Sequence, residues 1–245
     1  MIKKKTAWMI GIISFLVPVI VFALLLRVVM SQITMMGTQQ RITKTENFTS
    51  LVSIAPQEAT VFFGDSITEL CPLEEIYAEY SKQSGVPVIN RGISAETTTT
   101  MLERFEANVL GLKPRNLVLL MGVNDISEGI SLEQSIQNIQ EMIQMTKSQS
   151  PQTHIVLQAV YPINITGRKE FYEKFQIGDR DNERIYQFNQ ELEKLAAAEK
   201  VTFLNVNEQL MDEQGELKYE YSFDGLHPNI DGYMAIRDFI IQNLK

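Results

Sequence analysis

Five short apolar runs, separated by longer segments with helical spacing, constrain the fold of this chain most strongly. A strand alternates apolar and polar residues when one of its faces meets water, so continuous apolar runs predict strands that are buried on both faces. The runs are TVFF (60–63), VPVIN (86–90), NLVLLM (116–121), HIVLQAV (154–160) and VTFLNV (201–206).

The segments between and after these runs predict helices. Because parallel neighbouring strands need a crossover connection, strands that alternate with helices indicate a parallel sheet covered on both faces. The sequence therefore predicts one doubly wound α/β domain with a five-stranded parallel sheet. The stretch from Pro162 to Arg180 has no clear pattern and is expected to cover one end of this sheet. The expected helices are Leu73–Ser81, Thr98–Leu110, Leu132–Lys147, Asp181–Lys200 and Ile230–Leu244.

An apolar run near the N-terminus predicts one transmembrane helix. Ala7 to Leu26 holds about 20 residues without a charge, and at roughly 1.5 Å per residue such a helix spans about 30 Å, the thickness of the bilayer hydrocarbon. The basic residues 3–5 precede it, which favours a cytoplasmic N-terminus and an extracytoplasmic remainder. A cleaved signal peptide is the alternative, although the run is long for one and no small-residue cleavage pattern follows it.

Four parts of the chain follow from this organisation. Residues 1–6 are expected to form a cytoplasmic basic tail and residues 7–29 the membrane anchor. Residues 30–56 are rich in Ser, Thr and Gln without a sustained pattern, which predicts a stalk with at most a short helix. Residues 57–245 are expected to form the folded domain.

The charge balance argues against nucleic acid as a partner. Setting aside Lys3, Lys4, Lys5 and Arg27 leaves 18 of the 22 basic residues against 30 acids, a net charge of −12. Phosphate binding needs clustered Lys and Arg, and no such cluster follows the first residues. The single cysteine, Cys71, excludes an intramolecular disulfide, and a lone cysteine is more often a buried apolar side chain than a nucleophile.

Polar clusters follow the first three predicted strands. They are Gly64-Asp65-Ser66, Arg91-Gly92 and Gly122-Val123-Asn124-Asp125. In parallel α/β sheets ligands bind beyond the carboxyl ends of the strands, and all three clusters fall at that edge. The sequence therefore predicts a site there.

Ser66 has two interpretations, a helix N-cap or a nucleophile. A serine after a strand is by itself most often a cap, and a nucleophile needs a base. Of the two histidines, His154 opens an apolar strand and is expected to be structural. His227 precedes a proline, which favours a loop, and Asp224 lies about one turn earlier, where its carboxylate could orient the imidazole. Taken alone, this pair could instead cap the last helix.

Asn124 is equally ambiguous on its own. The sequence Gly-x-Asn-Asp after a strand is typical of a turn, because Gly and Asn tolerate left-handed backbone angles. In a site, the Asn124 amide could instead donate a hydrogen bond to an oxyanion, an interaction that is typically worth about 2.7–4 kcal/mol in the transition state.

The combined motifs GDSIT, NRGISAET, GVND and DGLHPN resemble the SGNH (GDSL-type) hydrolases, a flavodoxin-like family of esterases and lipases. The resemblance covers about residues 59–245. It implies Ser66 as nucleophile, His227 as general base and Asp224 as its orienting acid. The backbone N–H of Ser66 and the Asn124 side chain would be oxyanion donors, with Gly64, Asp65, Gly122 and Asp125 as supporting residues.

The second motif departs from the family pattern. Members commonly read N-x-x-I-S-G-D-T, and the glycine before the acid supplies a third oxyanion N–H. Here that position is Ala95, and Gly92 lies three residues earlier. Ala95 is expected to keep the donor role if its φ is negative, with Gly92 permitting the turn.

Together with the predicted membrane anchor, the resemblance implies a membrane-anchored extracytoplasmic serine esterase that needs no metal or cofactor. The preferred substrate class is an O-acetylated cell-envelope polysaccharide or exopolysaccharide. Four alternatives stay open: a lipase or lysophospholipase, a thioesterase, an O-acyltransferase using the same residues, and a noncatalytic envelope-binding module. A binding module would have no need for Ser66, Asn124, Asp224 and His227 together.

Overall fold

The computed structural model describes residues 2–167 and 170–245, without the side chains of residues 2–7 and 9–13. Contacts divide the chain into two units, Met1–Glu46 and Asn47–Lys245. The first unit is a single helix, α1 (Ile2–Leu51), whose last residues belong to the second unit. The side chains of the predicted basic tail, residues 1–6, lie outside the described residues.

Helix α1 is long and apolar enough to cross a membrane. Its Ser14–Leu51 part contains an 18-residue window with a mean hydropathy of 2.3, and a signal sequence would meet the same criteria. The helix also differs from expectation, because residues 31–51 are helical instead of an irregular stalk. No proline interrupts this stretch, and the Thr34 and Thr38 hydroxyls bond to carbonyls one turn earlier, at 3.1 and 3.0 Å.

The second unit contains the predicted five-stranded parallel sheet, with the strand order β2-β1-β3-β4-β5. All five strands were expected from the sequence. The second begins later than its apolar run, because Pro87 has no N–H to give to a ladder. The strands are β1 (Thr60–Gly64), β2 (Val88–Asn90), β3 (Asn116–Leu120), β4 (His154–Gln158) and β5 (Thr202–Leu204).

Strand β1 shows why its run is apolar throughout. Successive side chains of a strand point to opposite faces of the sheet. The Phe62 ring packs on Tyr77, with centroids 5.0 Å apart, and the Phe63 ring packs on Phe105 in α5 at 5.3 Å. Both faces of β1 are therefore covered by helical layers, and both phenylalanines are buried.

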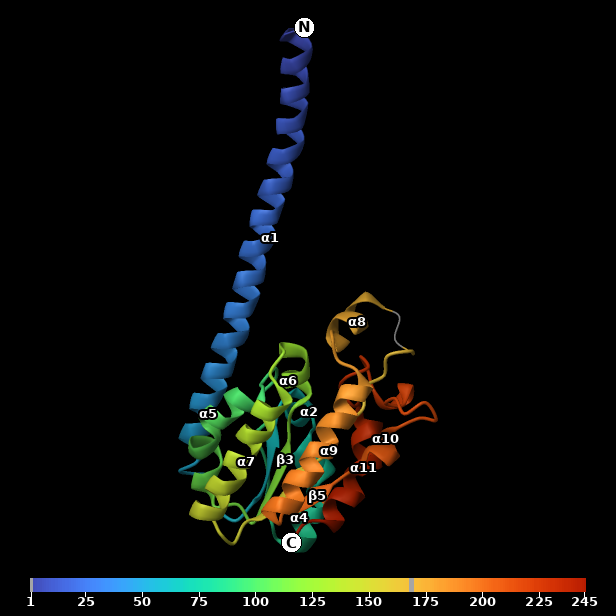
Figure 1. The fold of residues 1–245 in the computed structure, drawn as a ribbon. Coiled ribbons are helices and arrows are strands. Elements are labelled where there is room, and N and C mark those ends of the chain that lie inside the picture. The colour runs from blue at the N-terminus through green and yellow to red at the C-terminus, as the bar shows by residue number, and fades with distance from the viewer. Residues whose placement is uncertain (1, 168–169) are drawn as a thin grey trace. The chain divides into compact units, whose positions relative to one another are not determined.

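One helical layer consists of α5 (Thr98–Asn108), α7 (Leu132–Gln149) and α9 (Asn182–Glu199), which lie side by side (Figure 1). On the other face, α11 (Ile230–Gln242) packs near α3 (Leu73–Ile76) and α4 (Ala78–Ser84). The single helix expected over Leu73–Ser81 is wrong. The chain turns at Tyr77, with φ −102° and ψ 13°, and starts a new helix.

Several helices are too short for a helical period to be visible in their sequence. Two of them matter for the site, because α2 (Ser66–Glu69) and α6 (Val123–Glu128) begin directly beyond β1 and β3. The others are α8 (Phe171–Ile177), α10 (Asn207–Leu210) and the 3₁₀ turns Leu110–Leu112 and Tyr219–Tyr221.

The last turn of α1 belongs to the second unit, where it contacts α5 and the loop after β2. Thr49 accepts a hydrogen bond from Asn108 Nδ2 at 2.8 Å, and the Arg91 guanidinium lies 4.7 Å from the centre of the Phe48 ring. These contacts explain why the compact unit begins at Asn47, ten residues before the start at residue 57 that was expected from the sequence.

Candidate active site

The carboxyl edge of the sheet brings together Ser66, Asn124, Asp224 and His227. Ser66 and Asn124 lie on the short helices that follow β1 and β3, and His227 lies in the loop before α11. The other histidine, His154, is the first residue of β4 and so lies at the opposite edge, where its Nε2 contacts the Asn243 carbonyl at 3.0 Å.

Ser66 is the first residue of α2, and it does not cap this helix. Asp65 is the cap, because its Oδ1 accepts the Ile67 N–H at 2.9 Å. The interpretation of Ser66 as an N-cap is therefore wrong. The first N–H groups of a helix have no acceptor within the helix, so the Ser66 N–H is a donor at the edge of the site.

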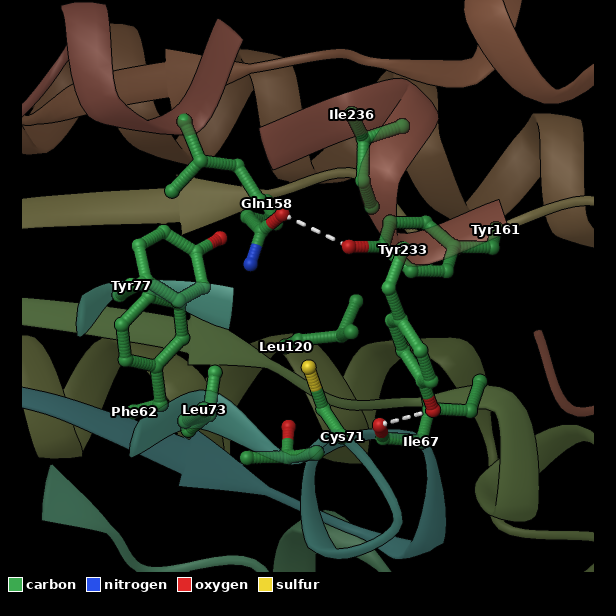
Figure 2. Close-up of a pocket in the computed structure, with 12 residues that line it drawn as sticks. Phe62, Ile67, Cys71, Leu73, Tyr77, Leu120, Gln158, Tyr161, Tyr233 and Ile236 are labelled. Carbon is green, nitrogen blue, oxygen red and sulfur yellow. Dashed lines mark hydrogen bonds between the residues drawn. The ribbon is translucent and has the colours of Figure 1, made fainter. Parts of the chain in front are cut away.

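Helix α2 is held from behind by α11. The Tyr233 hydroxyl donates to the Ile67 carbonyl at 2.8 Å, one residue beyond Ser66 (Figure 2). The cavity between them has a volume of about 20 Å³, which holds about one water molecule and is too small for an acyl group. This packing fixes the backbone that carries Ser66.

His227 links Ser66 to Asp224. Its Nε2 lies 2.8 Å from Ser66 Oγ, and its Nδ1 lies 2.6 Å from Asp224 Oδ2. Asp224 Oδ1 accepts two backbone N–H groups, from Leu226 at 2.9 Å and from His227 at 2.8 Å. All three side chains are buried, with Ser66 and His227 each 8 % exposed.

The hydrogen bonds to Asp224 decide its charge state. Burial alone would raise the pKa of Asp224, but the bonds from the His227 ring and from the two N–H groups outweigh it and leave the pKa below its ordinary value. Asp224 is then a carboxylate that only accepts. His227 therefore carries its proton on Nδ1 and presents a lone pair on Nε2 to the Ser66 hydroxyl.

Ser222 also shapes the loop before α11. Ser222 Oγ donates to the His227 carbonyl at 2.9 Å and accepts the Gly225 N–H at 2.8 Å. Asn229 caps α11 by accepting the Gly232 N–H at 3.1 Å, so the capping interpretation of the Asp224–His227 pair is also wrong.

Asn124 has both ends of its amide engaged. Its Nδ2 donates to the Glu96 carbonyl at 2.9 Å, and its Oδ1 accepts from Arg180 Nη2 at 2.6 Å. Arg180 was not expected at the site, and it lies just after α8 in the segment without a clear pattern. The expectation that this segment covers one end of the sheet agrees with the contact, because Asn124 lies beyond the end of β3.

Gly122 and Asp125 support Asn124 from either side. Gly122 has φ +119°, and a Cβ there would lie 2.5 Å from the Phe188 ring, so only glycine fits. Asp125 is fully buried and accepts from the Thr98 backbone N–H at 3.0 Å and from Ser135 Oγ at 2.8 Å. These bonds tie α6 to the starts of α5 and α7.

Ala95 departs from the expected backbone conformation. Its φ is +62°, in the left-handed region, so the negative φ that the sequence led us to expect for a donor at this position is not present. The loop keeps a conformation that favours glycine, and the alanine pays a steric cost of about 1–2 kcal/mol for it. The loop is held on both sides, by Glu69 Oε2 on the Ser94 N–H and by Asn124 on the Glu96 carbonyl.

Gly92 is required for a different reason from the expected one. Its φ is not in the positive range, and the turn does not depend on it. A Cβ on Gly92 would instead lie 2.3 Å from the backbone nitrogen of Glu69, because the loop crosses α2 at close range. Gly92 thus lets this loop approach the helix that begins with Ser66.

Burial raises the pKa values of two acidic groups near Ser66. Burial raises the pKa of Asp65 to about 7, against the hydrogen bond from Ile67 and the charges of His227 and Arg180. Burial likewise raises the pKa of the Cys71 thiol to about 12, with Glu74 adding to it. Cys71 lines the small cavity behind α2, as expected for a buried apolar side chain (Figure 2).

Three comparisons with known proteins agree with this fold. Residues 62–235 match the GDSL-like lipase/acylhydrolase family. The isoamyl acetate-hydrolyzing esterase of Saccharomyces cerevisiae is 26 % identical over 213 residues, which cover 77 % of this chain and 86 % of the yeast enzyme.

Two solved structures are similar as well. One is a Streptococcus pneumonia protein provisionally assigned as a platelet activating factor, with 30 % identity and a TM-score of 0.73 over 83 % of this chain and 94 % of that one. The other is a GDSL-like lipase from Bacteroides thetaiotaomicron, with 26 % identity and a TM-score of 0.65 over 81 % and 95 %.

Fold and comparisons together define a hydrolase that acts on ester bonds. The chain belongs to the GDSL-like lipase/acylhydrolase family, in agreement with the resemblance to SGNH hydrolases seen in its motifs. Within residues 2–167 and 170–245, no three His, Cys, Asp or Glu side chains gather in a way that could hold a metal ion.

Proposed function

We propose that the protein is a membrane-anchored serine esterase with Ser66 as nucleophile, His227 as general base and Asp224 as the orienting acid. The observation that carries the proposal is the pair of hydrogen bonds from His227, 2.8 Å to Ser66 Oγ and 2.6 Å to Asp224 Oδ2. A nucleophile, a base and an orienting carboxylate in this order are what acyl transfer through an enzyme ester requires.

The first half-reaction forms the acyl-enzyme. Ser66 Oγ attacks the ester carbonyl carbon while His227 Nε2 takes the hydroxyl proton. The carbonyl π electrons move to the oxygen, which becomes an oxyanion. When the tetrahedral intermediate collapses, the bond to the leaving alcohol breaks and His227 returns the proton to that oxygen. Asp224 stabilises the imidazolium that exists between the two transfers.

Hydrogen-bond donors around Ser66 would stabilise the oxyanion. The Ser66 N–H at the start of α2 and one N–H of Asn124 Nδ2 are two of them, because Asn124 has two amide hydrogens and Glu96 takes only one. Ala95 is proposed as the third, through its backbone N–H in the loop held by Glu69 and Asn124. Deacylation repeats the sequence with water in place of Ser66 as the attacking group.

Acetyl esters are the proposed substrates, and O-acetylated envelope or extracellular polysaccharide is the proposed class. The yeast relative is named for hydrolysing isoamyl acetate, an acetyl ester, which supports a short acyl group. A strongly acidic folded domain suits a neutral, acylated saccharide better than a phosphate-rich polymer, which it would repel.

The membrane anchor is proposed from helix α1. Its apolar side chains between residues 14 and 36 are exposed within the first unit, for example Phe15 at 70 % and Phe22 at 68 %. Such a surface is costly in water and favourable in lipid. We expect the full-length protein to stay in the membrane fraction after an alkaline wash, and its domain to be digested by protease outside intact cells. A processed, freely released protein would mean that residues 7–29 form a cleaved signal peptide.

The full-length protein in mild detergent tests the catalytic proposal. Wild type and Ser66→Ala are compared on p-nitrophenyl esters of increasing acyl length and on acetylated xylan. We expect the wild type to prefer the acetyl ester and the variant to lose activity. Equal rates for the two proteins would refute the role of Ser66, and a preference for long acyl chains would refute the substrate class.

A further inference from the structure

Arg180 makes four hydrogen bonds to α6 and to the end of α8, which fix its side chain in the protein. Its Nε donates to the Val123 carbonyl at 2.9 Å, and its Nη1 donates to the carbonyls of Gln176 at 2.9 Å and Ile177 at 3.1 Å. Its Nη2 donates to Asn124 Oδ1 at 2.6 Å. A guanidinium has five N–H groups, so these contacts use nearly all of them. Arg180 is therefore built into the protein and is not free to bind a substrate carboxylate.

The contacts on Asn124 define which way its amide points. Arg180 has only N–H groups to offer, and the Glu96 carbonyl has only lone pairs. If the amide were rotated by 180°, its NH₂ would face Arg180 and its oxygen would face the Glu96 carbonyl, so that both hydrogen bonds would be replaced by repulsion. With one N–H on Glu96, the second Nδ2 hydrogen is held in a fixed direction.

We propose that Arg180 is a positioning residue for ester hydrolysis, which fixes the Asn124 amide so that its free Nδ2 hydrogen faces the oxyanion. The inference rests on the proposed function, in which Asn124 is an oxyanion donor. Because Nη2 bears positive charge and contacts Oδ1, it also polarises the amide and makes Nδ2 a stronger donor. A donor that is already oriented needs no reorganisation during the reaction. This preorganisation is why such a donor stabilises the transition state.

The chain offers a matched control for this arginine. Arg184, one turn further along at the start of α9, also binds helix α6, with its Nη2 on the Ile126 carbonyl at 2.8 Å. Its Nη1 binds the Asp179 carbonyl at 3.2 Å. Both arginines thus connect α6 to the same region, but these two bonds of Arg184 go to backbone carbonyls and not to the Asn124 amide. Substituting either arginine should weaken the anchoring of α6. Only substituting Arg180 should release the Asn124 amide.

The test is a double-mutant cycle on the full-length protein with p-nitrophenyl acetate. Removing an oxyanion donor costs about 10²–10³-fold in rate, so we expect Arg180→Met to lower kcat about 10–100-fold with little change in KM. Arg184→Met should stay within about threefold of wild type, because it removes one anchor of α6 and leaves the Arg180–Asn124 contact in place. In an Asn124→Ala background, Arg180→Met should cause almost no further loss.

The outcomes separate the two proposals. If Arg180→Met costs the same factor with and without Asn124, or if Arg184→Met costs as much as Arg180→Met, the positioning role is overturned while Ser66 keeps its role. If Ser66→Ala is as active as wild type, the proposed function falls and the role of Arg180 falls with it. Thermal unfolding checks that each variant is folded. Should Arg180→Met not fold, the cycle is run with Arg180→Lys, for which an additive loss would equally overturn the proposal.

Discussion

The Nε2 of His227 lies 2.8 Å from the Oγ of Ser66, although 161 residues separate them in the chain. The sheet order brings them together, because Ser66 follows the interior strand β1 and His227 precedes the helix that packs behind it. Asp224, on the same loop as His227, completes the arrangement at 2.6 Å.

Asp224→Asn should lower kcat about 10³–10⁴-fold with a small effect on KM. An asparagine can keep the bonds from the Leu226 and His227 N–H groups, but its NH₂ would then face His227 Nδ1. The imidazole would move its proton to Nε2 and could no longer accept from Ser66. Asp212→Asn is the control, because Asp212 also accepts backbone N–H groups, from Gln214 and Glu216, but is not paired with a histidine. An Asp224→Asn enzyme with more than half the wild-type kcat would contradict this role.

The value of kcat/KM should fall with decreasing pH along a limb of unit slope. His227 must be neutral to accept the Ser66 proton, so an enzyme molecule with a protonated imidazole is inactive. Hydrogen bonds hold the pKa of Asp224 below its ordinary value of 3.8, so its protonation adds no second step in the weakly acidic range. Initial rates from pH 4.5 to 8 test this. A flat profile would exclude His227 as the base, and a slope of two would mean that a second group must also be ionised.

Asp65→Asn should change how stability depends on pH. The folded carboxyl holds its proton up to about pH 7, whereas the unfolded one loses it near 3.8. The folded state binds more protons in this window, so the free energy of unfolding should decrease as pH rises from about 4 to about 7, by a few kcal/mol at most. Asparagine can still accept the Ile67 N–H as the helix cap, but it does not titrate, so this pH dependence of the free energy of unfolding should disappear.

Urea unfolding at several pH values measures the effect. The exposed Asp231→Asn is the control and should leave the pH dependence of the wild type in place. If the slope between pH 4 and 7 is the same in wild type and in Asp65→Asn, the buried carboxyl of Asp65 is not its source.

Ala95→Gly should stabilise the protein by about 0.5–1 kcal/mol and leave kcat at or above the wild-type value. Glycine adopts φ +62° without the clash that alanine meets, although it loses more chain entropy on folding. Ala235→Gly, in the middle of α11, is the matched control and should destabilise by about 0.5–1 kcal/mol. Equal losses at both positions would show that Ala95 is unstrained.

Much of the fold could be predicted because its signals are local. The run at 60–63 is apolar on both faces since Phe62 and Phe63 each meet a helical layer. The polar residues after β1, β2 and β3 had to share one edge once the sheet was parallel. The long amphipathic helices agree with their periodicity, whereas α2 and α6 are too short to have one.

What the sequence did not reveal depends on contacts across the fold. Arg180 binds backbone carbonyls and one amide oxygen, and none of these leaves a pattern near residue 180. The left-handed conformation of Ala95 comes from a loop held by Glu69 and Asn124, which alanine itself disfavours. The Asp65 cap was hidden because both Asp and Ser are good caps, and only the structure shows which one accepts the Ile67 N–H.

The nucleophile can be identified directly by trapping the acyl-enzyme. Full-length protein is mixed with p-nitrophenyl acetate, quenched in acid within its first turnovers, digested and analysed by mass spectrometry. The account predicts one acetyl group on the peptide that carries Ser66, and none on that peptide in Ser66→Ala. An acetyl group on another residue of the wild type, or a Ser66→Ala enzyme that turns over normally, would contradict the account.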